Sequence, residues 1–96
     1  MSDYDFFGKV VMLTGAGGGI GLATAEYCFQ CGASIAATYN NNLAITELTH
    51  TLDVSAKRIF VRQVDVADSE SCLGFVRECQ ERFGSIDFLV NNAAAL

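Results

Sequence analysis

The chain has 96 residues, of which 51% are hydrophobic and 18% are charged, and its net charge is −5. This length predicts one domain over residues 1–96, and the apolar fraction excludes a disordered chain. The acidic balance argues against nucleic-acid and anionic-membrane partners, which need clustered Lys and Arg. No apolar run approaches the roughly 20 residues of a membrane span, and Asp3 and Asp5 are unlike the start of a secretory signal. We therefore expect a soluble, cytoplasmic protein.

Strand-like and helix-like segments alternate along the first half of the chain. Residues 9–14 form a short apolar run that ends in glycines, which predicts a buried strand. Residues 19–31 have a helix-like composition and end at Gly32, a common stop residue. Residues 34–39 predict a second strand, and the three asparagines of 40–42 supply a turn and a helix N-cap.

The same alternation continues in the second half. Residues 43–52 predict a weak helix, and residues 58–64 alternate apolar and basic side chains, as is typical of a strand near a sheet edge. A helix over 70–83 is expected between an Asp-Ser-Glu cap and the following glycine, and residues 86–90 predict a fourth strand. Because strands and helices alternate throughout, the pattern predicts a parallel sheet with right-handed crossovers.

The four cysteines fit apolar helix positions better than a metal site. Cys28 and Cys31 have metal-like spacing, but Cys72 and Cys79 lie seven residues apart, which fits no common zinc pattern. No secretory signal supports a disulfide framework. Helical spacing instead places the second pair on one apolar face together with Phe75, Val76 and Phe83. A structural role is favoured, and a metal or redox site is the alternative.

A glycine-rich segment, Thr-Gly-Ala-Gly-Gly-Gly-Ile-Gly over residues 14–21, links the first strand to the first helix. Such a turn brings backbone N–H groups and the positive end of a helix dipole onto a phosphate. A Cβ at the closest approach would hold a pyrophosphate away, so glycine is needed there. No Lys-Ser/Thr pair follows, which excludes a P-loop. The strand before the turn and the helix after it make this a dinucleotide-binding motif.

Three motifs in this order resemble the short-chain dehydrogenase/reductase family. They are Thr14-Gly-x-x-x-Gly19-x-Gly21 with Phe-Gly-Lys-Val just before it, Asp65-Val66 after the third strand, and Asn91-Asn92-Ala93-Ala94 after the fourth. The last is similar to the family's Asn-Asn-Ala-Gly, with Ala94 in place of Gly. The resemblance covers essentially all 96 residues. It implies an α/β fold, a Rossmann-type doubly wound parallel sheet in the order 3-2-1-4, truncated after the fourth strand, with the cofactor bound where the order reverses.

The resemblance also implies roles for individual residues. Thr14 is similar to the residue that tethers the glycine turn to the fourth-strand motif. The carboxylate of Asp65 and the backbone amide of Val66 would hold the adenine ring, and Ile20 and Ala93 would line the cofactor groove. The expected cofactor-binding residues are Gly15, Gly18, Gly19, Ile20, Gly21, Tyr39, Asn40, Asn41, Asp65, Val66, Asn91 and Ala93.

The end of the second strand favours NADP over NAD. An NAD-selective site carries a carboxylate there, which bonds the adenosine 2′-OH and would repel a 2′-phosphate. This chain has Tyr39 followed by three asparagines, and NADP-preferring members of the family often carry Tyr at this point. The basic residue usual in such members is missing, since position 18 is Gly and the nearest cation is Lys57. Asparagine side chains and helix amides would then hold the phosphate.

The family's proton relay is not encoded in these residues. Its Tyr gives or takes the proton and a Lys four residues on lowers the pKa of that Tyr, but no Tyr-x-x-x-Lys occurs here. His50 lies on the polar side of a weak helix and is expected to be a solvated surface residue. The chain resembles the N-terminal, cofactor-binding part of an oxidoreductase that moves hydride between NADP(H) and a carbonyl or secondary alcohol. Alone it is expected to be inactive, with no catalytic residues, and the alternative is a non-catalytic nucleotide-binding or interaction module.

The expected partners are the dinucleotide cofactor and more protein. One helix, the one over 70–83, cannot cover a face of four parallel strands. An uncovered strand such as 86–90 is a template for association. We therefore expect self-association or a missing C-terminal half.

Overall fold

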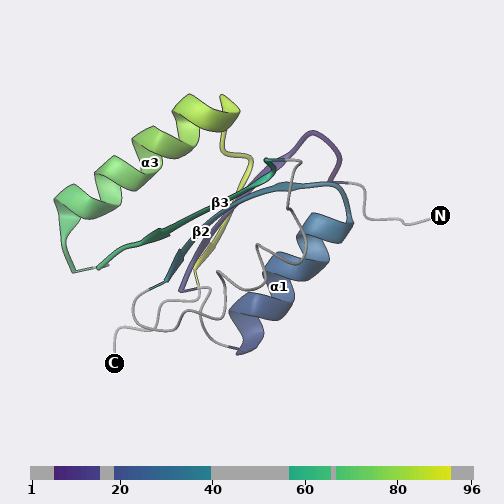
Figure 1. Ribbon diagram of the computed structural model, residues 1–96, viewed down its shortest axis with the longest axis horizontal. Coiled ribbons are helices and arrows are strands. Elements are labelled where there is room, and N and C mark those ends of the chain that lie inside the picture. Colours follow the sequence, from purple (N-terminus) through teal and green to yellow (C-terminus); the bar gives the residue numbers. More distant parts are fainter. Residues whose placement is uncertain (1–5, 16–18, 40–56, 66, 92–96) are drawn as a thin grey trace.

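Four parallel strands form one sheet with a helix on each face (Figure 1). The computed structural model describes residues 6–15, 19–39, 57–65 and 67–91. In chain order the elements are β1 (Val10–Thr14), α1 (Gly19–Gln30), β2 (Ser34–Tyr39), β3 (Ile59–Gln63), α3 (Ser69–Phe83) and β4 (Phe88–Asn91). The sheet order is β3-β2-β1-β4, which confirms the expected fold and the edge position of the third strand. The weak helix expected over 43–52, with His50, lies outside the described residues.

The ends of both helices follow from local chemistry. The carboxylate of Asp68 accepts hydrogen bonds from the backbone N–H groups of Glu70 and Ser71, at 3.1 and 3.4 Å, and so caps α3. Gly84 ends α3 in the left-handed conformation, with φ 82°, and its N–H donates to the Gln80 carbonyl. Gly32 after α1 has φ 104°, and a Cβ there would come within 3.0 Å of the Phe7 backbone. The predicted cap at Asp68 and the stops at Gly32 and Gly84 are therefore confirmed, whereas the turn and N-cap predicted over 40–42 lie outside the described residues.

The α1 side of the sheet holds one of two apolar cores. It contains the buried residues Val11, Leu13, Ala25, Cys28, Phe29, Ala33, Ile35 and Ala37. Arg58, just before β3, closes this core at the C-terminal end of α1. Its Nη2 donates to the carbonyls of Phe29 and Ala33, each at 2.8 Å, and its guanidinium lies 4.0 Å from the centre of the Phe29 ring. A cation at a helix C-terminus also suits the helix dipole.

The α3 side holds the second core. Its buried residues are Val10, Met12, Ala36, Phe60, Val64, Phe75 and Cys79, and Cys72, Val76 and Phe83 pack against them. This confirms the apolar helix face that spacing predicted for the two C-terminal cysteines. The rings of Phe60 and Phe75 stack with centroids 5.5 Å apart. Phe60 is buried on this face, whereas Ile59 and Val61, the apolar positions of the predicted alternation, pack against the core on the α1 side.

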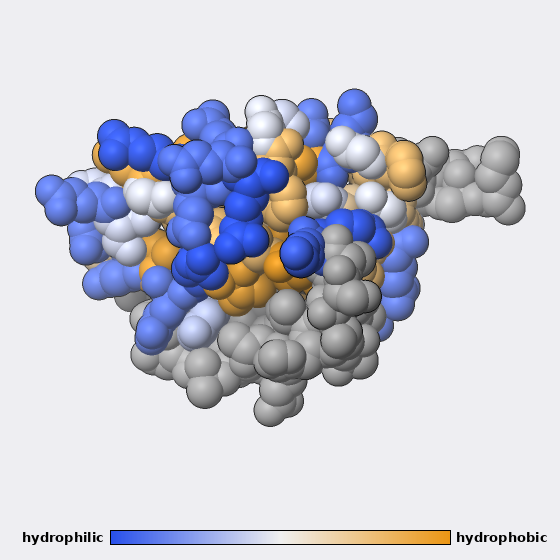
Figure 2. Space-filling model, turned by 45° about the horizontal axis from the view of Figure 1, so that its top comes forward, coloured by the Kyte–Doolittle hydropathy of each residue, from blue (hydrophilic) through white to orange (hydrophobic). Residues whose placement is uncertain are grey.

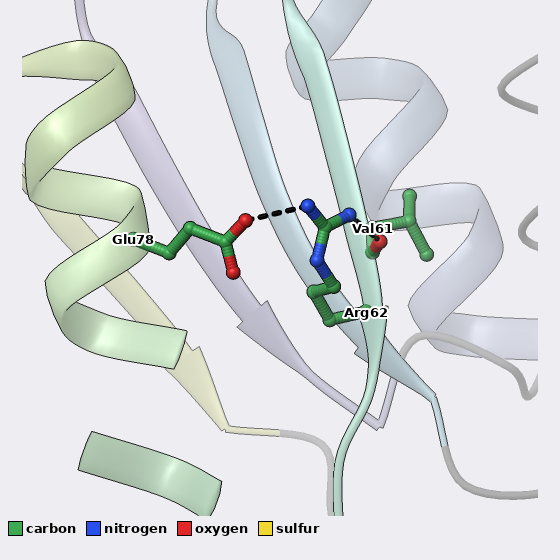
Figure 3. Close-up of polar contacts among 3 residues, drawn as sticks. All are labelled: Val61, Arg62 and Glu78. Carbon is green, nitrogen blue, oxygen red and sulfur yellow. Dashed lines mark hydrogen bonds and ion pairs between the residues drawn. The ribbon is translucent and has the colours of Figure 1, made fainter. Parts of the chain in front are cut away.

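Arg62 on β3 joins the sheet to α3. Its guanidinium pairs with the carboxylate of Glu78 and donates from Nη1 to the Val61 carbonyl at 2.9 Å (Figure 3). The same guanidinium lies 4.3 Å from the centre of the Phe60 ring. Figure 2, which brings the α3 side forward, shows mostly hydrophilic residues there with hydrophobic residues visible between them. Charged side chains thus cover part of the second core.

The fourth strand begins at Phe88, two residues later than the sequence predicts, and ends at Asn91. The reason is Asp87, whose carboxylate accepts the Val10 N–H at 2.8 Å while its own N–H donates to the Val10 carbonyl at 2.9 Å. A side chain thus takes the place of a ladder carbonyl. Phe88 is 46% exposed and Leu89 64% exposed. They flank the sheet on opposite faces, since successive strand residues alternate, so exposed apolar surface gathers on β4.

Candidate functional site

The carboxyl ends of all four strands meet at one edge of the sheet. Register places Thr14 beside Asn91 and Tyr39 beside Gln63. β1 lies between β2 and β4, so the strand order reverses between β1 and β4 at this edge. In open α/β sheets this is where ligands bind.

The glycine turn starts directly after β1. Gly15 has φ 69°, a left-handed conformation that glycine adopts without a steric cost. Its N–H donates to the Thr38 hydroxyl on β2 at 3.2 Å. α1 begins at Gly19, and Gly21 is buried, as expected for a glycine that lets the helix pack closely.

A second contact holds the turn from the other side. The Thr14 hydroxyl donates to Oδ1 of Asn91 at 2.8 Å, across the β1–β4 pair. This confirms the tether between the glycine turn and the fourth-strand motif that the resemblance implies. The start of the turn is therefore bonded to both strands that flank β1.

Asp65 lies just past β3 at the same edge. Its Oδ1 accepts the Ala67 N–H at 2.9 Å, and its carbonyl accepts the Asp68 N–H at 2.9 Å. The thiol of Cys72 approaches the same carbonyl at 3.9 Å. These bonds fold the chain into a turn between β3 and α3 and keep Asp65 at the surface.

Other expected site residues have mixed surroundings. Ile20, in the first turn of α1, is 78% exposed beside the glycine turn. Tyr39 is half-buried and packs against the α1-side core. Five expected residues lie outside the described parts of the chain, namely Gly18, Asn40, Asn41, Val66 and Ala93.

The chemistry of this edge fits a phosphate-bearing dinucleotide. α1 directs the positive end of its dipole to this edge, and no acidic residue stands in its first turn. Among the expected site residues the one carboxylate is that of Asp65, which lies just past the end of β3, two strands from β1. A negatively charged ligand would therefore meet no carboxylate in the first turn of the helix.

The cysteines sit apart from this edge except for Cys72. Burial raises the pKa of the Cys28 thiol, with a smaller contribution from Cys31, and burial raises the pKa of the Cys79 thiol. Raised pKa values favour the protonated thiol, which is a poor metal ligand and nucleophile. Within the described residues no three His, Cys, Asp or Glu side chains are grouped as metal ligands, and neither helix is long and apolar enough to cross a membrane.

Sequence reasoning missed Thr38 and Asp87. Thr38 is only 2% exposed, inside a strand that otherwise reads as apolar. The signal was a single hydroxyl residue after Ile35, Ala36 and Ala37, close to the strand end. Asp87, between two apolar residues at the start of the fourth strand, gave a similar signal.

A parallel sheet in this order, with a glycine turn leading into a helix where the order reverses, defines a nucleotide-binding Rossmann fold. The family model that matches the chain, over residues 9–96, is described as short chain dehydrogenase. The chain therefore belongs to the short-chain dehydrogenase family of oxidoreductases.

Individual relatives and structures agree with this family. The chain is 35% identical over 85 residues to oxidoreductase BOA17 of Botryotinia fuckeliana, covering 88% of this chain and 30% of that protein. It is 40% identical over 89 residues to the cattle 15-hydroxyprostaglandin dehydrogenase [NAD(+)], covering 90% of this chain and 33% of that protein. The crystal structure of a hydroxysteroid dehydrogenase from Escherichia coli is similar with a TM-score of 0.85 at 25% identity, covering 97% and 40% of the two chains. The chain thus spans about a third of the length of the curated relatives it matches.

Proposed function

We propose that the chain, as one domain over residues 1–96, binds a nicotinamide dinucleotide as part of an oxidoreductase. The observation that carries this proposal is the glycine turn bonded to both neighbouring strands at the ligand-binding edge of the sheet. The Gly15 N–H is bonded to Thr38, and Thr14 is bonded to Asn91. A turn whose first residue is held in this way has less freedom to lose when a ligand binds, which lowers the entropic cost of binding.

Each part of the cofactor has proposed partners. The pyrophosphate would lie on the turn and the start of α1, the adenine ring against Asp65 and Val66, and the ribose near Asn91. The residues proposed to hold the cofactor are Gly15, Gly18, Gly19, Ile20, Gly21, Tyr39, Asn40, Asn41, Asp65, Val66, Asn91 and Ala93. When bound, the nicotinamide ring supplies a hydride donor or acceptor for a carbonyl or secondary alcohol.

NADP is the proposed cofactor, in preference to NAD. The support is the absence of a carboxylate at Tyr39 and over residues 40–42, where an NAD-selective site would carry one. The cattle relative is named for NAD(+), but that name describes the relative. The preference for NADP rests on this chain's own side chains.

The chain by itself is proposed to be inactive. No Tyr-x-x-x-Lys occurs in it, so the family's proton donor is missing from these 96 residues. The same observation favours the second candidate function, a non-catalytic nucleotide-binding or interaction module. An activity assay does not distinguish an inactive part of an oxidoreductase from a non-catalytic module, because neither would convert a substrate. A binding assay distinguishes a chain that binds nucleotide from one that binds none.

Calorimetric titration of the purified chain with NADP, NAD and adenosine 2′,5′-bisphosphate tests the proposal. The two ligands with a 2′-phosphate should bind more tightly than NAD. Loss of half the cofactor contacts would weaken a dissociation constant of about 1 μM to about 1 mM. A clear preference for NAD would contradict the cofactor assignment, and no binding of any of the three would contradict the function.

A matched pair of glycine variants sharpens this test. Gly19→Val places methyl groups where the phosphate is expected and should abolish binding. Gly74→Val is the control, because a Cβ at Gly74 in α3 meets nothing within 4 Å. Equal binding by the two variants would argue against a phosphate at the start of α1. NADPH with a panel of ketones and aldehydes should be oxidised no faster with the chain than without it.

We also propose that the chain is cytoplasmic and that it associates with itself or with further protein through β4. Phe88 and Leu89 are 46% and 64% exposed on opposite faces of that strand, and β4 has a neighbour on one side only within the described residues. Light scattering at low micromolar concentration tests this. A monodisperse monomer of 10.3 kDa with cooperative unfolding would contradict it.

A further inference from the structure

Thr38 is the buried polar residue of the sheet. At 2% exposure it is the one polar or charged side chain that counts as buried among the residues the structure describes. It stands between Ala37 and Tyr39 on β2, the strand that is sandwiched between β1 and β3. A buried hydroxyl needs a hydrogen-bond partner, and here the partner is the Gly15 N–H at 3.2 Å.

This bond replaces a regular step of the β1–β2 ladder. The ladder starts where the Ser34 N–H donates to the Lys9 carbonyl, and its register pairs Leu13 with Ala37. Bonds in a parallel ladder recur every two residues along each strand, so the Gly15 N–H faces residue 38. A regular ladder would send that N–H to the Thr38 carbonyl. The side-chain oxygen takes it instead.

The use of a side-chain acceptor in place of the Thr38 carbonyl matters because the chain leaves the sheet at Gly15. Gly15 has φ 69° and so turns out of the strand direction. A main-chain acceptor on β2 would keep the chain in the ladder for another residue. An acceptor on a side chain stands beside the strand and fixes the Gly15 N–H at the point where the chain leaves the ladder.

We propose that Thr38 is a positioning residue for the phosphate-binding turn, with its hydroxyl holding Gly15 in the left-handed conformation. This inference rests on the proposed function, since it is the dinucleotide that would use the turn. The Thr38 bond connects the turn to β2 within the proposed site. The next residue along β2 is Tyr39, where the 2′ end of the adenosine is proposed to lie, so the same short segment of β2 serves both the pyrophosphate and the 2′-phosphate.

Three substitutions separate the hydroxyl from the rest of the side chain. Thr38→Val keeps the branched shape and removes the acceptor. Thr38→Ser keeps the acceptor and should restore the wild-type behaviour. Thr24→Val is the control, because the Thr24 hydroxyl donates to the Ile20 carbonyl within α1 at 2.8 Å and does not touch Gly15. Thr38→Ala removes the acceptor without branching and serves if the valine variant does not fold.

The first measurement is amide hydrogen exchange at Gly15 in the nucleotide-free chain. We expect exchange at least about tenfold faster in Thr38→Val than in the wild type, since a tenfold change corresponds to the loss of about 1.4 kcal/mol of protection. Thr38→Ser and Thr24→Val should stay within about threefold of the wild type. Unchanged exchange in Thr38→Val, or equal acceleration in Thr38→Ser, would overturn the proposal.

The second measurement is calorimetric titration with NADP and with adenosine 2′-monophosphate, which lacks the pyrophosphate. A positioning role predicts that Thr38→Val weakens NADP binding about tenfold and adenosine 2′-monophosphate binding much less. Equal losses for the two ligands would indicate general damage to the fold and would overturn the proposal. If the wild-type chain binds neither NADP nor NAD, the proposed function fails, and the exchange result alone decides whether Thr38 anchors the turn.

Discussion

Arg58 offers a direct test of what holds the first helix to the sheet. Arg58→Ala removes two hydrogen bonds, both 2.8 Å long, to the carbonyls of Phe29 and Ala33, and a cation–π contact with the Phe29 ring at 4.0 Å. Hydrogen bonds from a charged donor contribute about 1.5–3 kcal/mol each. A partly exposed cation–π contact contributes about 0.5–1 kcal/mol.

The combined loss is smaller than the sum of these figures, because one guanidinium makes all three contacts and both bonds come from the same nitrogen. We expect the free energy of unfolding to fall by about 2–4 kcal/mol, which is a large part of the total for a domain of this size. In a chain of about 100 residues each kcal/mol shifts the Tm by about 4–8 °C, so the Tm should fall by about 10 °C or more.

Thermal unfolding followed by circular dichroism, at one fixed protein concentration, measures this loss. Arg77→Ala is the matched control, since Arg77 is an exposed arginine on α3, and it should change stability by less than about 0.5 kcal/mol. Arg58→Lys keeps the charge but loses the planar fork, and should recover only part of the stability. A Tm for Arg58→Ala equal to that of Arg77→Ala would refute the reasoning that the Arg58 contacts stabilise the packing of α1 on the sheet.

Three further outcomes are expected. Arg62→Ala should lower the free energy of unfolding by less than about 1 kcal/mol, with a smaller loss in 1 M NaCl, because the ion pair with Glu78 joins side chains that are 43% and 37% exposed; a loss insensitive to salt would contradict the ionic contribution. Phe75→Ala should cost about 3–5 kcal/mol, because Phe75 is 5% exposed in the α3-side core; a loss below about 1 kcal/mol in denaturant titrations would mean that this core is not packed. The raised pKa values of Cys28 and Cys79 favour the neutral thiols in the folded state, so the stability that these thiols contribute is complete below the unfolded-state pKa of about 8.5 and is lost as the pH rises through the folded-state pKa. The free energy of unfolding should therefore fall with pH between pH 7 and 10, and it should fall less steeply in a variant with both Cys28→Ala and Cys79→Ala. An equally steep fall in that variant would exclude the thiols as its source.

The sequence predicted the strands and helices of the described chain well because most of its signals are local. The apolar run of β1, the Asp68 cap and the stop glycines Gly32 and Gly84 each act within a few residues of themselves. Where a distant group intervenes, prediction was less accurate. β4 starts at Phe88 and not at the predicted residue 86, because the Asp87 side chain accepts a hydrogen bond from the Val10 N–H, 77 residues away in sequence.

The candidate site divides in the same way. The glycine turn could be predicted from residue types visible in the chain, and the tether from Thr14 to Asn91 was implied by the resemblance to the short-chain dehydrogenase/reductase family. The Thr38 bond could not, because a hydroxyl residue near the end of an apolar strand indicates a buried polar group but does not identify its partner 23 residues away.

The sequence by itself determined the alternation of strands and helices, the parallel sheet and the position of the glycine-rich turn, because hydrophobic period, caps and glycine placement are set by residues close together in the chain. Only the tertiary structure decided which polar groups meet across strands. Arg58 bonds to carbonyls at the end of α1, Asp87 accepts the Val10 N–H, and Thr38 accepts the Gly15 N–H. These hydrogen bonds join residues 23 to 77 positions apart. Such bonds depend on register and side-chain direction, which exist only once the strands are side by side.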